Sequence, residues 1–480
     1  NPAAAHLNRR KFLALSAATP GAATLAGCRR PDIEILPFSA VPDEQIGHST
    51  SGKPTFYATS IPRAGGALPV LVESHDGRPT KIEGNPQHPA SGGATDAFAQ
   101  ATVFDLYSPD RVMSDKYPGV MEKGAPRRWA DFDRAARTLI KPQGEGFYVL
   151  TDQSPSPALR LIREHIKTAL PKASWHTYEP VDQSEALAGA EIAFGSKLVA
   201  RYDFAKIDRV LALDSDFLGT DADAVEYGRE FAKRRKVEKL ADQMNRLYVV
   251  EPTYTVTGTM ADHRLRLPAS QIGAFLLAVV KELKATHNAS LHHATTVPNP
   301  PEPGTAFPEK WVKAVAKDLA EHGGKAVVIV GHRQPAWVHA LAHAVNVATS
   351  SPVAYTAAPP EATEKTIRDL ARDMAAGKVA TLLVIGGNPA LDAPADADFK
   401  NALQKVGTRI RLGLFHDQTS ELCDWHLPMA HPLECWGDSE TADGTLCCVQ
   451  PLIAPLNGSR SPGAADTEPP ARGGRTALAV

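Results

Sequence analysis

Thiol and imidazole side chains gather in the segment 423–435, near the end of the chain. Cys423 and His426 are separated by two residues, and His431 and Cys435 are separated by three. Thiolate sulfur and imidazole nitrogen are common ligands of zinc, and ligand pairs with such spacings build zinc sites. The four residues are therefore a candidate metal site. Packing within a loop is the alternative, and the intervening Leu427-Pro428 favours it.

Two other patterns carry reactive side chains but favour structural roles. His339 and His343 lie four residues apart and would share one face of a helix, but their neighbours are apolar and no glutamate accompanies them. Cys447 and Cys448 are adjacent, and we interpret them as strand residues because a disulfide between neighbours is strained. The five cysteines show no Cys-x-x-Cys spacing, so these residues hold no zinc ribbon, ferredoxin-type cluster motif or thioredoxin motif.

Composition and charge narrow the classes of function. The 480 residues include 52 Lys and Arg and 54 Asp and Glu, which gives a net charge of −2. This balance argues against a nucleic-acid partner, because phosphates require a broad basic face. At roughly 150 residues per domain, the length predicts about three domains or one large two-lobed body. The longest apolar run of the body, 272–280, is too short for a membrane span.

The first 28 residues predict an export signal. Arg9 and Arg10 precede Lys-Phe-Leu, which is the twin-arginine export pattern. A short Ala-rich apolar stretch then leads to Leu-Ala-Gly-Cys28, which resembles a bacterial lipobox. We therefore expect the twin-arginine translocase to export the folded protein to the periplasmic face of the cytoplasmic membrane. Lipidation of Cys28 and cleavage of the signal are both open.

Apolar strands that alternate with helices must position the polar groups of the body. The short apolar runs are 147–150, 210–213, 247–250 and 381–385. Each ends in turn residues, and helical patterns lie between the runs, so the sequence predicts an α/β fold with a doubly wound parallel sheet in each of two lobes. Ligands of such sheets bind beyond the carboxyl ends of the strands. A cofactor would therefore contact the turns after these four runs, one of which begins at Glu251.

Turn signals and composition suggest domain boundaries. A hairpin over 67–84, with Gly77 in its turn, predicts a small β-rich domain. The last 24 residues are rich in Ala, Gly and Pro and keep no amphipathic period, which is typical of disorder. The predicted segments are a signal peptide over 1–28, a β-rich domain over 53–128, a first α/β lobe over 129–285, a Pro-rich linker over 286–310, a second α/β lobe over 311–456 and a disordered or frameshifted tail over 457–480.

The order of several motifs resembles that of the molybdopterin oxidoreductases. The matching segments are 77–89 (GRPTKIEGNPQHP), 107–111 (YSPDR), 129–136 (WADFDRAA), 386–389 (GGNP) and 424–428 (DWHLP), the last followed by Glu434 and Gly437. Each motif is short, and their shared order carries the resemblance. It implies the molybdopterin oxidoreductase fold. It also makes Gly386, Gly387, Asn388 and Pro389, together with Glu251, candidate residues of a vestigial pterin pocket.

Further segments are similar to one branch of that family, the B subunit of alternative complex III. These segments are 175–180, 244–251, 261–264 and 449–456. Alternative complex III is a bacterial quinol:electron-acceptor oxidoreductase of respiratory chains. The resemblance implies that the molybdopterin-like part lacks the metal cofactor and that a ferredoxin-like part, fused after it, holds the iron–sulfur clusters. It also implies haem-containing and quinol-binding membrane subunits as partners.

The residues themselves argue against a cofactor in this chain. A [4Fe–4S] cluster needs about four thiolates, but 56–72 contains no cysteine and Asp96 stands where the family's last cluster cysteine would fall. Asp152, Ser154 and Ser156 are the nearby candidates for a molybdenum ligand, and turn and helix-cap chemistry is their alternative role. We expect neither a cluster nor molybdopterin here.

Three functions of different classes follow from these observations. The favoured one is a non-catalytic portion of an exported iron–sulfur subunit in a quinol-oxidising complex. The second is an active molybdopterin-dependent oxidoreductase with an unusual ligand set. The third is a free periplasmic binding protein that uses the inherited pocket.

Overall fold

The structure of the chain is a computed structural model. It describes residues 54–75, 77–111, 119–240, 242–287, 307–359 and 365–463. The predicted signal peptide, with Arg9, Arg10 and Cys28, lies outside the described residues. So do most of the predicted linker and residues 464–480 of the predicted tail.

A three-stranded antiparallel sheet begins the described chain. It consists of β1 (Thr55–Arg63), β2 (Gly66–His75) and β3 (Arg78–Gly84) in the order β1-β2-β3. Val70 and Val72 of β2 and Ile82 of β3 are fully buried, because alternate residues of a strand face the same side. Helix α2 (Ala97–Tyr107) packs on this sheet. The predicted hairpin over 67–84 and the small β-rich domain are confirmed.

A seven-stranded sheet forms the core of one lobe. Its order is β5 (Ala125–Pro126), β4 (Met121–Glu122), β16 (Trp425–Pro428), β15 (Thr408–Gly413), β14 (Thr381–Ile385), β6 (Phe147–Thr151) and β7 (Ser174–Thr177). The five strands from β16 to β7 are parallel. Apolar clusters cover both faces of the sheet. Helices of this lobe include α3 (Trp129–Leu139), α4 (Pro157–Ala169), α11 (Ile367–Ala375) and α13 (Phe399–Leu403).

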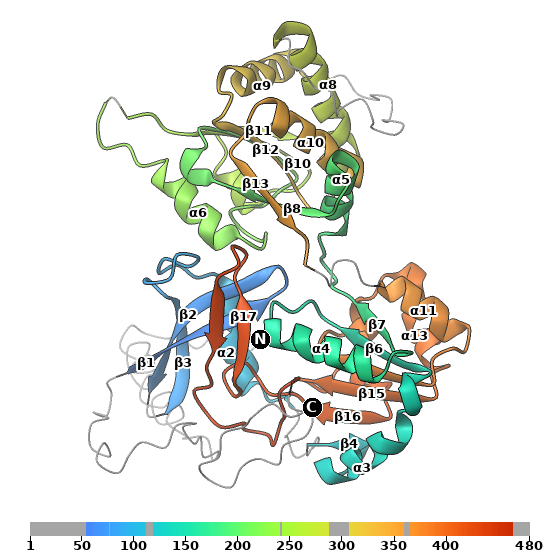
Figure 1. Cartoon of the computed structure of the whole chain (residues 1–480). Coiled ribbons are helices and arrows are strands. Elements are labelled where there is room, and N and C mark those ends of the chain that lie inside the picture. Colours follow the sequence, from blue (N-terminus) through green and yellow to red (C-terminus); the bar gives the residue numbers. More distant parts are fainter. Residues whose placement is uncertain are drawn as a thin grey trace, which may run out of the picture.

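A four-stranded parallel sheet forms the core of the other lobe. Its order is β11 (His263–Arg266), β10 (Arg246–Glu251), β9 (Arg209–Leu213) and β12 (Ala326–Val330). An antiparallel pair, β8 (Leu198–Tyr202) and β13 (Val353–Ala357), accompanies it. Its helices include α5 (Ser184–Phe194), α6 (Ala224–Lys233), α8 (Ala269–His287), α9 (Glu309–Glu321) and α10 (Ala336–Ala348). This lobe stands at the top of Figure 1, above the other parts.

The predicted allocation of strands to lobes is wrong. The predicted boundaries placed β6 and β7 in a lobe over 129–285, but β6 pairs with β14, more than 200 residues later in the chain. They placed β12 in a lobe over 311–456, but β12 pairs with β9. One lobe is therefore inserted within the other. Local periodicity predicts that a strand exists, whereas its partner is set by packing between residues far apart in sequence.

A hairpin connects the seven-stranded lobe to the N-terminal domain. It consists of β17 (Gly437–Glu440) and β18 (Leu446–Val449). Figure 1 shows β17 standing between the N-terminal strands and α4. On one side, Ser439 Oγ lies 2.7 Å from Ser60 Oγ, and the Gln450 backbone N–H donates to Thr59. On the other side, Asp438 of β17 accepts from the Ala158 backbone N–H of α4 at 2.9 Å, so the hairpin contacts two parts of the fold.

The residues just after the predicted boundary at 457 pack against the body. Trp129 Nε1 donates to the carbonyl of Gly458 at 2.8 Å, and the Arg460 guanidinium lies over the Trp129 ring. Arg460 also forms an ion pair with Asp133 at 3.2 Å. The folded part of the chain therefore extends beyond residue 457.

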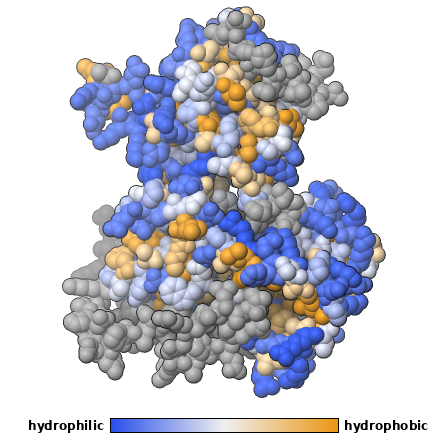
Figure 2. All heavy atoms as spheres, viewed as in Figure 1, coloured by the Kyte–Doolittle hydropathy of each residue, from blue (hydrophilic) through white to orange (hydrophobic). Residues whose placement is uncertain are grey.

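Within the described residues, no helix is both long enough and apolar enough to cross a membrane. On the face shown in Figure 2, apolar side chains form separate patches among hydrophilic ones.

Candidate functional site

The carboxyl ends of four adjacent strands bring most of the candidate residues together. In the sheet order, β7, β6, β14 and β15 are neighbours. Asp152 follows β6, and the turn of Gly386, Gly387, Asn388 and Pro389 follows β14. Ligands of parallel sheets bind at such an edge, so we call this group the glycine-turn site.

A residue with a side chain would be strained at either glycine of the turn. Gly386 and Gly387 have φ angles of +69° and +58°, a region that side chains disfavour. A Cβ atom on Gly386 would clash with the carboxylate of Asp152, and one on Gly387 would lie 2.7 Å from the same group. The backbone of the turn therefore lies in direct contact with the carboxylate of Asp152.

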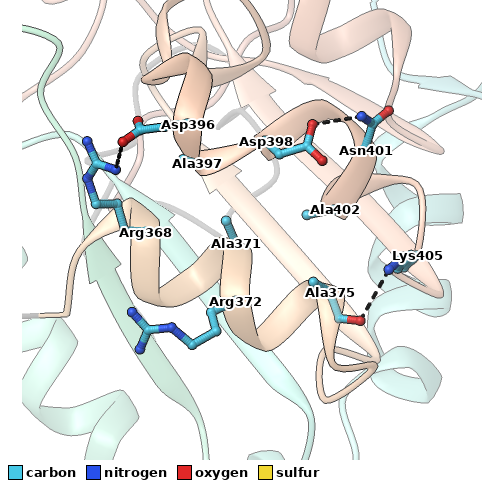
Figure 3. A pocket seen from close by; sticks show the side chains of 10 residues that line it. All are labelled: Arg368, Ala371, Arg372, Ala375, Asp396, Ala397, Asp398, Asn401, Ala402 and Lys405. Atoms are coloured by element: carbon cyan, nitrogen blue, oxygen red, sulfur yellow. Dashed lines mark hydrogen bonds and ion pairs between the residues drawn. The ribbon is translucent and has the colours of Figure 1, made fainter.

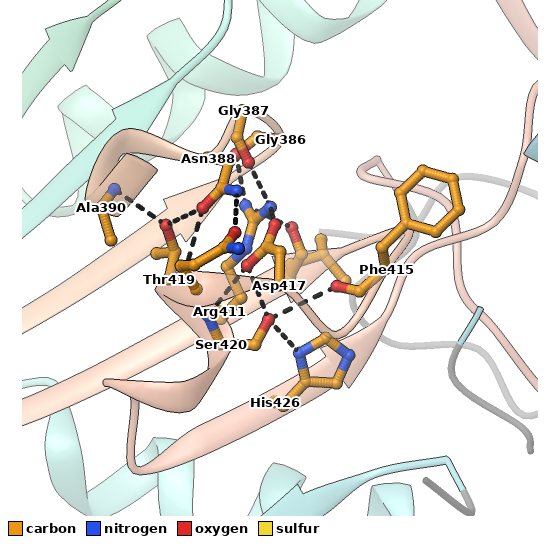
Figure 4. Close-up of polar contacts among 12 residues, drawn as sticks. Gly386, Gly387, Asn388, Ala390, Arg411, Phe415, Asp417, Thr419, Ser420 and His426 are labelled. Atoms are coloured by element: carbon orange, nitrogen blue, oxygen red, sulfur yellow. Dashed lines mark hydrogen bonds and ion pairs between the residues drawn. The ribbon is translucent and has the colours of Figure 1, made fainter. Parts of the chain in front are cut away.

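Arg411 occupies the inside of the glycine turn (Figure 4). Its side chain comes from β15 and is 3% exposed. The guanidinium donates to the carbonyls of Gly386 and Gly387 and, at 2.8 Å, to Asp417 Oδ2. The turn that resembles a pterin-contacting motif is thus bound to the chain's own arginine.

Asn388 ties the turn to the short helix α14 (Gln418–Glu421). Its Oδ1 accepts from Thr419 Oγ1 at 2.7 Å, and its Nδ2 donates to Gln418 Oε1 at 2.7 Å (Figure 4). Pro389 is buried at the start of α12 (Pro389–Asp392). Both polar groups of the Asn388 side chain therefore have partners within the chain.

Two half-buried carboxyl groups lie beside the turn. Burial raises the pKa of Asp152 to about 6, although the Arg411 charge lowers it. Burial and the Asp152 charge raise the pKa of Glu179, which follows β7, to about 7. Glu179 Oε1 accepts from the backbone N–H of Gln153 at 2.7 Å. These carboxyl groups take up and release protons near neutral pH.

The serines near Asp152 act in helix capping. Ser156 is buried as the N-cap of α4, and its Oγ accepts from the Leu159 backbone N–H at 3.1 Å. The same hydroxyl donates to Asp438 of β17. Ser154 Oγ accepts from the Ser156 backbone N–H at 3.3 Å. The contacts of both serines are therefore those of the predicted alternative, cap and turn chemistry.

Asp96 is the residue that the resemblance aligns with the family's last cluster cysteine. Its carboxylate accepts from the Ala99 backbone N–H at 2.8 Å, which caps α2. It also forms two hydrogen bonds with Arg63, at 2.5 and 2.8 Å. Residues 54–111 contain no cysteine. The residues present therefore do not fit an iron–sulfur cluster at this position.

Glu251 lies at the carboxyl end of β10, on the four-stranded sheet and not on the glycine-turn sheet. It is 1% exposed. Arg264 Nε donates to its Oε1 at 2.6 Å, and Thr255 Oγ1 donates to its Oε2 at 2.6 Å. Both oxygens of the predicted pocket residue thus have partners within its own lobe.

The predicted zinc ligands do not converge. His426 Nδ1 lies 2.9 Å from Ser420 Oγ, and His431 Nδ1 accepts from the Leu433 backbone N–H at 3.1 Å. Cys435 Sγ donates to the carbonyl of His431 at 3.5 Å. Burial raises the pKa of Cys423 to about 12, so its thiol stays protonated. In the part of the chain that the structure describes, no three His, Cys, Asp or Glu side chains are placed to hold a metal.

An ion pair that the sequence did not predict joins two family motifs. Arg111 donates to both oxygens of Glu434, at 3.0 and 2.6 Å, and both side chains are buried. Glu434 also accepts from the backbone N–H groups of His431 and Leu456. These motifs therefore hold the fold together. The role of Arg411 was not predicted either, although an arginine among the apolar residues of a strand is an available signal.

A surface hollow of about 360 Å³ lies away from the strand ends, between α11 and α13 (Figure 3). Arg368 and Asp396 form an ion pair at 2.5 Å across one end of it. Lys405 donates to the carbonyl of Ala375, and Asn401 donates to Asp398. These side chains therefore bond to other residues of the lining, whereas Arg372 pairs with Asp369 beside it. The hollow does not include the glycine-turn site.

Comparisons with known proteins agree on the fold. No family model matches the chain. The chain is 25% identical over 426 residues to the menaquinone reductase, molybdopterin-binding-like subunit, of Nitratidesulfovibrio vulgaris strain Hildenborough. The match covers 81% of this chain and 60% of that subunit. The structure resembles acetylene hydratase from Pelobacter acetylenicus, with a TM-score of 0.55 and 12% identity over 89% of this chain and 68% of that one.

The chain has a molybdopterin oxidoreductase-like fold. The predicted fold class, with two doubly wound lobes and a small β-rich domain, is confirmed. The chain spans about 60% of the length of the curated relative, so the activity and partners of the complete protein are proposals.

Proposed function

We propose that this molybdopterin oxidoreductase-like chain is the non-catalytic portion of an exported iron–sulfur subunit in a quinol:electron-acceptor oxidoreductase of the alternative complex III type. One observation carries the proposal. The turn that resembles a pterin-contacting motif is filled by Arg411, whose guanidinium bonds to the carbonyls of Gly386 and Gly387. A pterin amide that needs those backbone groups would have to displace a buried charge, which is costly.

The position at which the resemblance places an iron–sulfur cluster supports the same proposal. A cluster would need thiolates near Asp96, but that carboxylate holds Arg63 and the start of α2. The name of the curated relative, a molybdopterin-binding-like subunit of a menaquinone reductase, is consistent with a role in a quinone-linked complex. In this proposal, electrons pass through clusters outside this chain, and the chain serves as a scaffold for them.

The proposed partners and location follow from the export signal and the resemblance. The partners are haem-containing and quinol-binding membrane subunits, with the complex on the periplasmic face of the membrane. We propose export by the twin-arginine translocase, which would read Arg9 and Arg10. Replacing both arginines with lysine is expected to keep the protein in the cytoplasm, as measured by fractionation. Export of this variant at the normal level would contradict the route.

The experiment that tests the function is purification of the tagged, full-length protein from its native membranes. We expect haem and iron–sulfur subunits to co-purify, and we expect molybdenum and pterin to be absent from the chain by metal analysis and pterin fluorescence. Stoichiometric pterin would instead support an active molybdopterin-dependent enzyme. A soluble protein that carries no partner would support the free binding protein.

A further inference from the structure

Helix α2 of the N-terminal domain carries apolar side chains on both of its faces. Ala99, Val103 and Leu106 are buried against the three-stranded sheet. On the opposite face, Phe98 and Phe104 are 66% and 77% exposed. A helix that is apolar all round is normally covered on every side. The outer face of α2 therefore has the composition of an interface.

The outer face is apolar over most of the length of the helix. Ala97 and Ala101 are exposed between the two phenylalanines, because residues three or four apart share one side of a helix. Asp105 is the charged residue of this face. Exposed apolar surfaces that extend over neighbouring residues mark places where another chain segment or molecule binds.

The chain that leads into β1 contains an apolar run of its own. Residues 29–53 lie between the predicted signal peptide and the first described residue, Pro54. Within them, residues 33–38 read Ile-Glu-Ile-Leu-Pro-Phe, whereas residues 43–53 are polar or small apart from Ile46. The apolar side chains of this leading segment are therefore concentrated in one short stretch.

The strand register places the start of the described chain near one end of α2. Thr55 pairs with Ser74 of β2, and Ser74 pairs with Pro79 of β3. At the end of α2, the Tyr107 hydroxyl donates to the Pro79 carbonyl at 2.8 Å. Neighbouring strands are about 4.8 Å apart, so Thr55 lies about 10 Å from Pro79. The chain thus enters the fold at the end of α2 that carries Phe104.

The segment between the apolar run and β1 is long enough to reach the whole outer face. Residues 39–53 separate Phe38 from Pro54, and an extended chain of this length spans about 50 Å. Helix α2 has 11 residues, which corresponds to a length of about 16 Å. A covalently attached segment also has a high effective concentration at a surface beside its point of attachment. A second copy or another subunit has no such advantage.

We propose that residues 33–38 dock on the outer face of α2, so that the leading segment of this chain forms a strap across the N-terminal domain. Undocked, residues 29–53 would let the body lie up to about 90 Å from residue 28. Docking at residue 33 shortens this tether to about 17 Å. The strap would therefore hold the body close to whatever surface binds the exported N-terminus. This inference is independent of whether the chain binds pterin.

The test is site-specific photo-cross-linking of the full-length protein in its native membranes. Phe104→p-benzoylphenylalanine places the reactive group on the outer face of α2, at a position that is already exposed. After irradiation, mass spectrometry is expected to find residues 33–38 of the same molecule as the main cross-linked peptide. A mixture of isotopically light and heavy chains distinguishes the same molecule from a second copy. The matched control is Leu161→p-benzoylphenylalanine, on α4 and 64% exposed, which should not cross-link to this peptide.

Substitutions in the apolar run provide a second measurement. The double variant Ile35→Asp, Phe38→Asp puts two charges where apolar contact is proposed, so the cross-link from position 104 should fall several-fold. Ser49→Asp adds a charge in the polar part of the same segment and should leave the cross-link unchanged. Equal yields from the double variant and the wild type would contradict docking through residues 33–38.

Other products of the cross-linking would overturn the strap. These are a cross-link from position 104 to a second copy, to another subunit or to another part of this chain, the absence of any cross-link, and an equal yield of the same peptide from position 161. A cross-link to another subunit would at the same time support the proposed complex. Co-purification without haem or iron–sulfur subunits would remove the proposed function and leave the strap standing.

Discussion

The carboxyl edges of the two sheets differ in how their charges are matched. On the four-stranded sheet, Glu251 meets Arg264, and Asp214, after β9, accepts from Arg333 at 2.5 Å. On the seven-stranded sheet, Arg411 gives most of its donors to backbone carbonyls and to Asp417. Burial raises the pKa of Asp152 at this edge to about 6, although the Arg411 charge lowers it, and burial with the Asp152 charge raises the pKa of Glu179 to about 7.

The carboxyl edges of the two sheets are therefore occupied by side chains in two different ways. On the four-stranded sheet, each of these carboxylates has its own guanidinium, and ion pairs close the edge. Where one guanidinium serves a turn, the neighbouring carboxyl groups hold protons because burial penalises their charged forms. Both edges would be available to ligands in an open sheet of this kind, and in this chain both are occupied by its own side chains.

The largest expected effect is the loss of Arg411. Arg411→Ala leaves Asp417 and two carbonyls without their buried partner, so we expect the free energy of unfolding to fall by about 3 to 5 kcal/mol. Urea unfolding followed by circular dichroism measures this. The control is Arg368→Ala, whose ion pair with Asp396 lies at the surface, so little or no loss is expected. Equal losses for the two variants would show that the turn does not depend on Arg411.

A methyl group on the glycine turn is the next largest perturbation. Gly386→Ala adds both a disfavoured φ angle and a clash with Asp152, so we expect a loss of about 2 to 3 kcal/mol. Gly377 has a φ of +71°, but a methyl group added there would meet no atom within 4 Å, which makes Gly377→Ala the matched control. The control should lose only about 1 kcal/mol in urea unfolding. If Gly377→Ala lost as much stability as Gly386→Ala, the clash with Asp152 would not be the cause of the loss.

Proton binding by Asp152 and Glu179 should make the free energy of unfolding depend on pH. The folded pKa values of Asp152 and Glu179 lie above their usual values of 3.8 and 4.5, so the native state binds more protons than the unfolded state between about pH 4 and pH 7. Stability from this pair is complete at the acid end and is lost as the pH rises through the two folded pKa values. Relative to wild type, the Asp152→Asn, Glu179→Gln double variant should lack this decline in urea titrations. An identical pH profile in both proteins argues against proton binding at this edge.

We expect the smallest loss of stability from a substitution at the carboxyl edge of the four-stranded sheet. Glu251→Gln keeps one acceptor oxygen for Arg264 or Thr255 but removes the charge, so we expect a loss of about 1 kcal/mol in urea unfolding. The matched change at an exposed position is Glu191→Gln, for which no loss is expected. If Glu251→Gln were more damaging than Arg411→Ala, the order of the two edges would be reversed.

Sequence and structure agree on local features and differ on distant pairings. The alternation of apolar runs and helices predicted the parallel strands and the turns at their carboxyl ends, because side-chain periodicity is a local property. It did not predict that β6 joins β14 or that β12 joins β9, because pairing depends on contacts between segments far apart in the chain. Spacing also proposed a grouping of Cys423, His426, His431 and Cys435 that the fold does not form among the described residues.

The sequence alone established the absence of thiolates around Asp96, the positions of the strand ends and the resemblance carried by the ordered motifs, since these depend on residue identity and order. Only the tertiary structure could bring Arg411 into the glycine turn and Asp438 to the first turn of α4. Ser156 and Asp438 are separated by 282 residues. A hydrogen bond depends on distance and direction in space, and no local pattern in the sequence encodes a contact across that separation.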